Sequence, residues 1–232
     1  MALTGKGVLA IWNGMTAEAD AEFVKWHVEE HIPERVGLPG FRRGRRYVAR
    51  DGHPKYFNFY EADTADVFTS AAYKARLNDP TPWSRNVMAQ FRDMSRTACD
   101  IVCSKGLGEG AWIETIRLVA TVPAQTFGKA LSETMVPRIA AQTGIVGVHL
   151  LQGRASDSQV ATTEKTIRGV PDQIADWIML IEAVEPEPVD ALRRDAASID
   201  AFRGCGAGEA IARGLYRLQF ALTKAELGAE ST

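Results

Sequence analysis

The stretch WHVEEHIPERVGLPGFRRGRRY, Trp26–Tyr47, runs from a helix through a proline-glycine turn into a strand. The helix is expected to begin after Thr16, whose hydroxyl suits an N-cap and which precedes acidic residues. It is expected to end near Gly37, which suits a C-cap, because Pro39 cannot continue a helix. Residues 41–50 then alternate apolar and basic side chains, which predicts a strand.

The segments on both sides of this stretch complete a β-α-β-β-α-β order within the first half of the chain. An uncharged apolar run before the helix predicts a strand, and an aromatic run after the Asp51-Gly52 turn predicts another. The expected elements are strands at 7–15, 41–50, 56–61 and 97–103, and helices at 16–37, 65–77 and 83–92. This order is typical of a ferredoxin-like unit.

The second half of the chain repeats the same order. A shift of 104 residues places Phe23 on Phe127, Pro33 on Pro137 and Gly40 on Gly144. The expected strands are 112–121, 145–151, 177–183 and 215–222, with helices at 123–141 and 188–197. A fixed shift combined with a repeated element order predicts an internal duplication. We therefore expect two units, 1–106 and 107–232, with a polar surface loop at 152–173 in the second.

Composition excludes several classes of protein. The 232 residues are 46% hydrophobic with a net charge of −2, so there is no basic excess to neutralise nucleic acid. No apolar run reaches the roughly 18 residues of a membrane helix, and the first residues do not resemble a secretory signal. The three cysteines have no CxxC spacing, which is typical of reduced thiols. We expect a cytoplasmic protein without nucleic-acid or membrane partners.

Two such units in tandem resemble the dimeric α/β-barrel superfamily in fused form. The stretch Trp26–Tyr47, together with PKYFNFYEAD at 54–63, resembles EthD-like proteins. The resemblance implies an α+β fold in which two ferredoxin-like β-α-β-β-α-β units form an intrachain dimeric α/β barrel. It also implies a small-molecule enzyme with cofactor-independent proton transfer (cyclase- or isomerase-like) or small monooxygenase-type chemistry. The implied substrate is an aromatic, lactone or polyketide-like compound, and the implied assembly is a monomer with an intrachain pseudo-dimer, or a homodimer.

Two histidines distinguish the first unit from the second. His27 and His31 are four residues apart and so share one helix face. The 104-residue shift places Leu131 and Met135 at their positions, in line with Phe127. That apolar stripe is expected to face the core, so the histidines should also point inward. Buried imidazoles need hydrogen bonds or solvent, which predicts a polar cavity in the first unit.

The predicted site has a catalytic group and a substrate-binding group. His27 and His31 are candidates for proton transfer because imidazole titrates near neutral pH, and Glu30 is a candidate to orient one of them. The candidate substrate-binding residues lie on neighbouring strands and are Trp12, Tyr47, Asn58 and Tyr60. The sequence does not decide which strand face meets the helix, because both faces carry aromatic or polar side chains.

Other interpretations of the same residues stay open at this point. His27–His31 matches an H-x-x-E-H string, in which histidines four apart can bind a divalent metal, and a haem site is a further alternative. No third ligand is identifiable, so we expect no metal and no cofactor. A non-catalytic ligand-binding or scaffold protein, whose histidines tie the helix to the sheet, is the alternative of a different class.

Surface positions are predicted for two further features. The five arginines at 42, 43, 45, 46 and 50 are typical of a solvated edge strand, although they could also attract an anionic substrate. His53 lies in a turn and is expected to be exposed. The glycine clusters lack the G-x-G-x-x-G spacing of a dinucleotide-binding loop.

Overall fold

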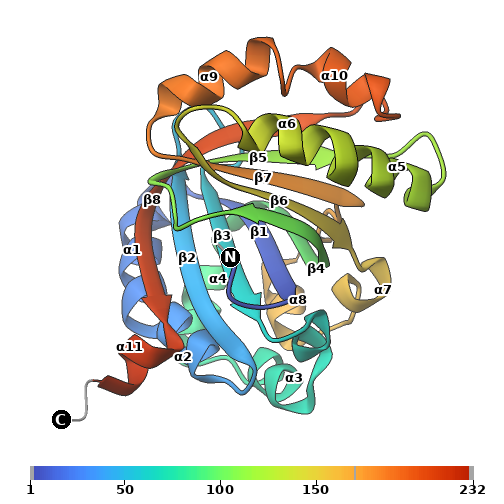
Figure 1. The fold of residues 1–232 in the computed structure, drawn as a ribbon. Coiled ribbons are helices and arrows are strands. Elements are labelled where there is room, and N and C mark those ends of the chain that lie inside the picture. Colours follow the sequence, from blue (N-terminus) through green and yellow to red (C-terminus); the bar gives the residue numbers. More distant parts are fainter. Residues whose placement is uncertain (1–2, 170, 230–232) are drawn as a thin grey trace.

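The computed structural model describes residues 3–169 and 171–229. The outer ends of the two expected units, 1–2 and 230–232, lie outside the described residues. Eight strands form a closed barrel in the order β1-β3-β2-β8-β5-β7-β6-β4, and all neighbouring strands are antiparallel (Figure 1). The strands are β1 (Gly7–Met15), β2 (Phe41–Ala49), β3 (Tyr56–Ala62), β4 (Phe91–Gly106), β5 (Trp112–Leu118), β6 (Ile145–Gly153), β7 (Trp177–Ala183) and β8 (Ala212–Thr223).

Each half of the chain contributes four consecutive strands to one side of the barrel. The first four lie in the order β4-β1-β3-β2, and the last four in the equivalent order β8-β5-β7-β6. Both are the strand order of a ferredoxin-like sheet. The two sheets join through the β2–β8 and β4–β6 pairs, which close the barrel. The fold class is therefore α+β with a closed antiparallel barrel.

Helices cover the outside of both sheets. In Figure 1, α5, α6, α9 and α10 lie across one side of the barrel, and α1 to α4 lie on the other. Their bounds are α1 (Asp20–Trp26), α2 (Ile32–Gly37), α3 (Ala71–Asn78), α4 (Pro82–Met88), α5 (Ala124–Ala130), α6 (Val136–Ala140), α9 (Pro186–Arg194), α10 (Ile199–Gly204) and α11 (Lys224–Ala229). None of the described helices is long and apolar enough to span a membrane.

The first helix of each half has the same irregular backbone. A π-helical turn joins α1 to α2 at His27–His31, and another joins α5 to α6 at Leu131–Met135. The turns that follow place Gly40 and Gly144 at the same φ of 82°, where a glycine avoids the cost of a Cβ atom. Residues 104 positions apart thus occupy the same local structures.

The arginine-rich strand β2 is not an edge strand, so that expectation is wrong, and of the five arginines in this region only Arg42 and Arg50 are exposed. The strand pairs with β3 on one side and β8 on the other, because closure of the barrel removes its free edge. Arg45 is fully buried and forms ion pairs with Glu61 and Glu182 inside the barrel. Arg43 also pairs with Glu61. These pairs compensate the charges that the interior would otherwise leave unsolvated.

The expected surface loop at 152–173 is a packed structure. It contains α7 (Ala155–Ser158) and α8 (Thr163–Arg168), and α8 packs against α3 and α4 of the first half. The Thr162 hydroxyl caps α8 by accepting a hydrogen bond from the Lys165 amide. Gly169 ends the helix in the left-handed conformation. The second half therefore covers part of the first.

Candidate functional site between the histidine helix and the sheet

A cavity of about 40 Å³ lies between the helix 20–37 and the outer face of the first-half sheet. Its walls come from several elements of the fold and from both halves of the chain. The main lining side chains are Leu9, Ile11, Asn13, His27, His31, Arg35, Asn58, Tyr60, Tyr73, Met94, Arg96, Glu164 and Arg168. A volume of this size has room for roughly three water molecules.

The two histidines form part of an aromatic stack along the inner face of the helix. His27 and His31 are 3% and 9% exposed, and their ring centroids lie 5.3 Å apart. Phe23 lies 5.0 Å from His27, and Trp26 lies 4.3 Å from His31. The prediction that both histidines point inward agrees with these positions.

Both imidazoles are held in the neutral form. Burial lowers the pKa of His27 well below 6.5, and the charges of Arg46 and Arg35 lower it further. Burial also lowers the pKa of His31, with smaller contributions from Arg35, His27, Arg168 and Arg76. A neutral imidazole offers one acceptor nitrogen and one N–H donor. The cavity therefore presents uncharged proton-accepting groups at neutral pH.

The sheet contributes a hydroxyl and two amides to the same cavity. The Tyr60 hydroxyl lies 3.3 Å from Nε2 of His27, and burial raises the pKa of Tyr60. The Asn58 side chain donates a hydrogen bond of 2.6 Å to Oδ1 of Asn13. Among the described residues, Nδ1 of His27, Nδ1 of His31 and Oδ1 of Asn58 have no hydrogen-bond partner. Buried polar atoms rarely stay unpaired, so this set indicates a site for a polar ligand.

Charged residues form another part of the cavity wall. Arg35 lies one helical turn beyond His31 and forms an ion pair with Glu164 of α8. Both side chains are almost fully buried, and Glu34 also pairs with Arg35 at 3.0 Å. Arg96 donates a hydrogen bond to the Tyr73 hydroxyl beside them. The pair between Arg35 and Glu164 joins the first half of the chain to residues 152–173 of the second half. We call these residues the covering segment.

Two predicted substrate-binding residues lie in a different place. Trp12 and Tyr47 point into the barrel, where Trp12 donates a hydrogen bond to Thr115. Asn58 and Tyr60 line the histidine cavity. The reason is strand alternation, since side chains on β1 and β2 point to opposite faces in turn. The grouping of Trp12 and Tyr47 with the histidines was therefore wrong.

Glu30 does not orient either histidine. Its Oε1 atom accepts hydrogen bonds from the Trp26 indole, the Thr81 hydroxyl and the Ser84 hydroxyl. Thr81 caps α4, so Glu30 ties the histidine helix to the start of α4. Position 30 is adjacent to His31 in sequence, so the two side chains leave the helix in different directions. Glu30 supports the site from outside the cavity.

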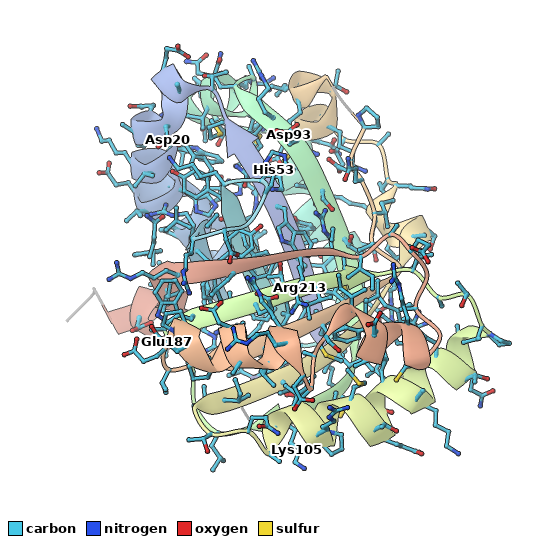
Figure 2. The ribbon with its side chains drawn as sticks, turned by 90° about the horizontal axis from the view of Figure 1, so that it is seen from above. Asp20, His53, Asp93, Lys105, Glu187 and Arg213 are labelled. Atoms are coloured by element: carbon cyan, nitrogen blue, oxygen red, sulfur yellow. The ribbon has the colours of Figure 1, made fainter. Side chains whose placement is uncertain are left out.

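His53 lies at the surface, apart from the cavity. Its Nε2 atom is 3.6 Å from Asp93, and Figure 2 shows the two residues side by side. Its side chain is 80% exposed, as the turn sequence predicts. His53 is therefore a useful control position for the buried pair.

The residues present do not fit a metal ion or a haem as they are arranged. The described part of the chain has no group of three or more histidine, cysteine or acidic side chains that could hold a metal. Nε2 of His27 faces the Tyr60 hydroxyl, and the rings of Phe23 and His31 flank the imidazole. A haem would need a far larger space beside these rings than the cavity of about 40 Å³ provides.

Several residues of the site were not predicted from sequence. Asn13 interrupts the apolar run of the first strand, two residues after Ile11 on the same strand face, which is a readable signal. Arg35 continues the spacing of His27 and His31 along one helix face, which is also readable. Glu164 and Arg168 carry no such signal, because their position depends on how 152–173 folds back.

The chain has the ferredoxin-like α/β-barrel fold of several solved structures. It shares 12% sequence identity with an anthrone oxidase-like protein at a TM-score of 0.63, over 97% of this chain and 96% of that one. A provisionally named monooxygenase from Fusobacterium nucleatum is 11% identical at a TM-score of 0.59, with 96% of each chain covered. A provisionally named chlorite dismutase is 10% identical at 0.55, with 97% of this chain and 98% of that one covered. No protein-family model and no curated protein matches the chain.

Proposed function

We propose that the protein is a cofactor-independent enzyme that removes a proton from a small aromatic or polyketide-like compound in the histidine cavity. The observation that carries this proposal is the group of unpaired buried atoms: Nδ1 of His27, Nδ1 of His31 and Oδ1 of Asn58. Most buried side-chain polar atoms that only support a fold are paired. The fold also hosts proteins described as anthrone oxidase-like and as monooxygenases, which supports a reaction of this class.

The proposed chemistry assigns different roles to the two imidazoles. Tyr60 keeps its proton because burial raises its pKa, so it donates to Nε2 of His27 and leaves the ring hydrogen on Nδ1. His27 then donates from Nδ1 to a substrate oxygen. His31 accepts a proton from a carbon next to the substrate carbonyl, and the bonding electrons move onto that oxygen as an enolate. Oδ1 of Asn58 accepts a hydrogen bond from a substrate hydroxyl.

The enolate has two possible fates. Reprotonation at another atom gives an isomerase- or cyclase-like outcome. With dioxygen as co-substrate, an anthrone methylene becomes a carbonyl, and the second oxygen atom leaves as water. Proton removal is the first step of both.

Substrate entry requires movement of the covering segment. The cavity of about 40 Å³ is smaller than the roughly 300–1,000 Å³ of small-molecule sites. The part of its wall that comes from the second half is α8, held by the pair between Arg35 and Glu164. We therefore place the entry route between α8 and the helix 20–37.

The two halves, 1–106 and 107–232, are further proposed to be copies of one unit, with the active cavity kept only in the first. The paired π-helical turns and the matched glycines support this duplication. A barrel closed within one chain needs no second subunit, so the expected state is a monomer. Light scattering in solution tests this, and a stable homodimer would contradict it.

The test of the proposed function is hydrogen–deuterium exchange at the methylene of anthrone and of a hydroxylated anthrone. Exchange is followed by NMR under nitrogen, and oxygen uptake is followed separately with an electrode. The wild type is expected to exceed the variant His27→Leu/His31→Met by 10² to 10⁴, a factor of about the size that general bases supply. His53→Gln is the matched control and should behave as wild type.

The outcomes separate the possible functions. Exchange without oxygen uptake indicates isomerase- or cyclase-like chemistry, and uptake indicates an oxygenase. Equal rates in the wild type and the double variant, or no rate above buffer, would overturn the proposal. Binding of the probes without exchange would indicate the non-catalytic ligand-binding alternative. A Soret band with one bound haem per chain after incubation with haem would favour the haem alternative.

A further inference from the structure

The two ends of the barrel interior differ in their charges. At one end, Arg45 pairs with Glu61 and Glu182, and Glu182 also accepts a hydrogen bond from the Gly110 amide. The Thr4 amide and hydroxyl donate to Glu61 as well. These contacts close that end with paired charges. The opposite end of the barrel interior contains a different charged residue, Arg117.

Arg117 stands at this opposite end. It follows Ile113 and Thr115 on the inward-facing side of β5, and its guanidinium lies 4.9 Å from the centre of the Trp12 ring. Within 3–169 and 171–229, no carboxylate pairs with it and no hydrogen bond satisfies it. Its side chain is partly buried, and burial lowers its pKa. Stacking on Trp12 offsets only part of the cost of burying an unpaired charge.

A cavity opens directly onto this arginine. Its volume is about 290 Å³, near the lower limit of small-molecule sites. The walls are mainly apolar and include Leu118, Ile174, Ala175 and Ile211. Ser95 lies in the same wall and donates its hydroxyl to the Gln173 carbonyl. The cavity thus combines one unpaired cation with an apolar surface.

We infer that this barrel mouth is a second binding site, separate from the histidine cavity, for a small organic carboxylate with an apolar body. The guanidinium of Arg117 matches the two oxygens of a carboxylate and can donate to both. The apolar walls favour an aromatic ring or a branched chain behind that group. An inorganic dianion fits less well, because the cavity supplies one cation and little else that is polar.

The separation from the histidine cavity follows from strand geometry. Arg117 and Trp12 lie on the inner face of the barrel, whereas His27 and His31 lie against its outer face. The sheet itself stands between the two sites. Binding at the mouth is therefore expected to be independent of the histidines.

The test is isothermal titration calorimetry with benzoate, acetate and benzyl alcohol as probes. Benzoate should bind, acetate should bind more weakly because it lacks the ring, and benzyl alcohol should bind more weakly because it lacks the charge. Arg117→Met should weaken benzoate binding ten- to a hundredfold, since a charge-assisted bidentate contact is lost. Arg217→Met, at an exposed position of β8, is the matched control and should leave binding unchanged.

Two further variants keep the inference open to refutation. Ala212→Trp places a large ring at the mouth and should block benzoate even if Arg117→Met fails to fold. His27→Leu/His31→Met should bind benzoate as the wild type does. Undiminished binding in both Arg117→Met and Ala212→Trp, loss of binding in the histidine variant, or no benzoate binding at millimolar concentration would overturn the inference. None of these results depends on whether the histidine cavity is catalytic.

Discussion

The helices at 20–37 and 124–140 have the same backbone conformation but carry different side chains towards the sheet. Each is interrupted by a π-helical turn, and each packs on the outer face of its own sheet. In the second half, Leu131 and Met135 fill the contact with an apolar cluster. In the first half, His27 and His31 occupy the same positions beside a cavity with unpaired polar atoms. The backbone sets the position of the site, and the side chains decide whether a site exists.

The comparison also explains why the covering segment matters. The connection that contains α8 belongs to the second half but packs over the first. It places Glu164 against Arg35 and forms part of the wall of the histidine cavity. The second half thus contributes to the site without carrying histidines of its own at these positions.

The largest effect is expected when histidines are placed in the second helix. The variant Leu131→His/Met135→His removes two fully buried apolar side chains and introduces imidazoles without partners. Each change should lower the free energy of unfolding by about 3 kcal/mol, from lost packing and buried polarity. Urea denaturation measures this loss. A loss below 1 kcal/mol would show that the second contact tolerates polarity as the first does.

The reciprocal exchange is the control for this prediction. His27→Leu/His31→Met should leave the free energy of unfolding within about 1 kcal/mol of wild type or raise it, because it removes buried groups that lack partners. A strong destabilisation would mean that the histidines serve the fold rather than a ligand.

An effect of intermediate size is expected from the contact between the halves. Glu164→Gln leaves Arg35 buried with only Glu34 as a counter-ion. Removal of one partner from a buried pair should cost about 3 kcal/mol in the free energy of unfolding. Asp63→Asn, in the exposed pair with Arg42, should cost less than about 1 kcal/mol. Equal losses in the two variants would contradict the role given to α8.

A smaller effect on the free energy of unfolding is expected when the pH is lowered. The pKa of both cavity histidines lies below 6.5 in the folded chain, so the unfolded chain binds more protons as pH falls below that value. Their contribution to the free energy of unfolding is therefore complete above pH 6.5. It is lost as the pH falls from 6.5 towards their pKa in the folded chain. The slope should reach about 1.4 kcal/mol per pH unit for each histidine. The arginines that face them stay charged in this range and contribute no slope.

The same measurement on His27→Leu/His31→Met isolates this contribution. Denaturation curves between pH 7 and pH 5 should show a shallower dependence in the variant than in the wild type. Parallel curves would mean that the two imidazoles are not held neutral by the fold.

The element order could be read from the sequence because periods of 2 and 3.6 are local properties. The inward face of the first helix followed from the apolar stripe through Phe127, Leu131 and Met135. Closure of the barrel at β2–β8 is not local, and it buries three of the five arginines that were expected to be exposed, Arg43, Arg45 and Arg46. The packing of 152–173 over the first half was missed for the same reason.

The site was predictable in part. The histidine pair and the strand of Asn58 and Tyr60 were identified, because helical spacing and strand alternation are visible in sequence. Trp12 and Tyr47 were misplaced, because tertiary packing decides which face of a strand meets the helix. Glu164 comes from a segment 129 residues beyond Arg35, a contact that no local pattern encodes.

The most direct test of the difference between the two helices is the ¹⁵N–¹H spectrum of histidine-labelled protein at pH 5.5, with and without a hydroxylated anthrone. A free imidazole is mostly protonated at this pH. His27 and His31, assigned through single substitutions, should be less protonated than a free imidazole, and their nitrogen resonances should shift when the probe is added, whereas those of His53 should not. Protonated rings at positions 27 and 31 that do not respond to the probe would contradict a neutral, ligand-binding histidine pair.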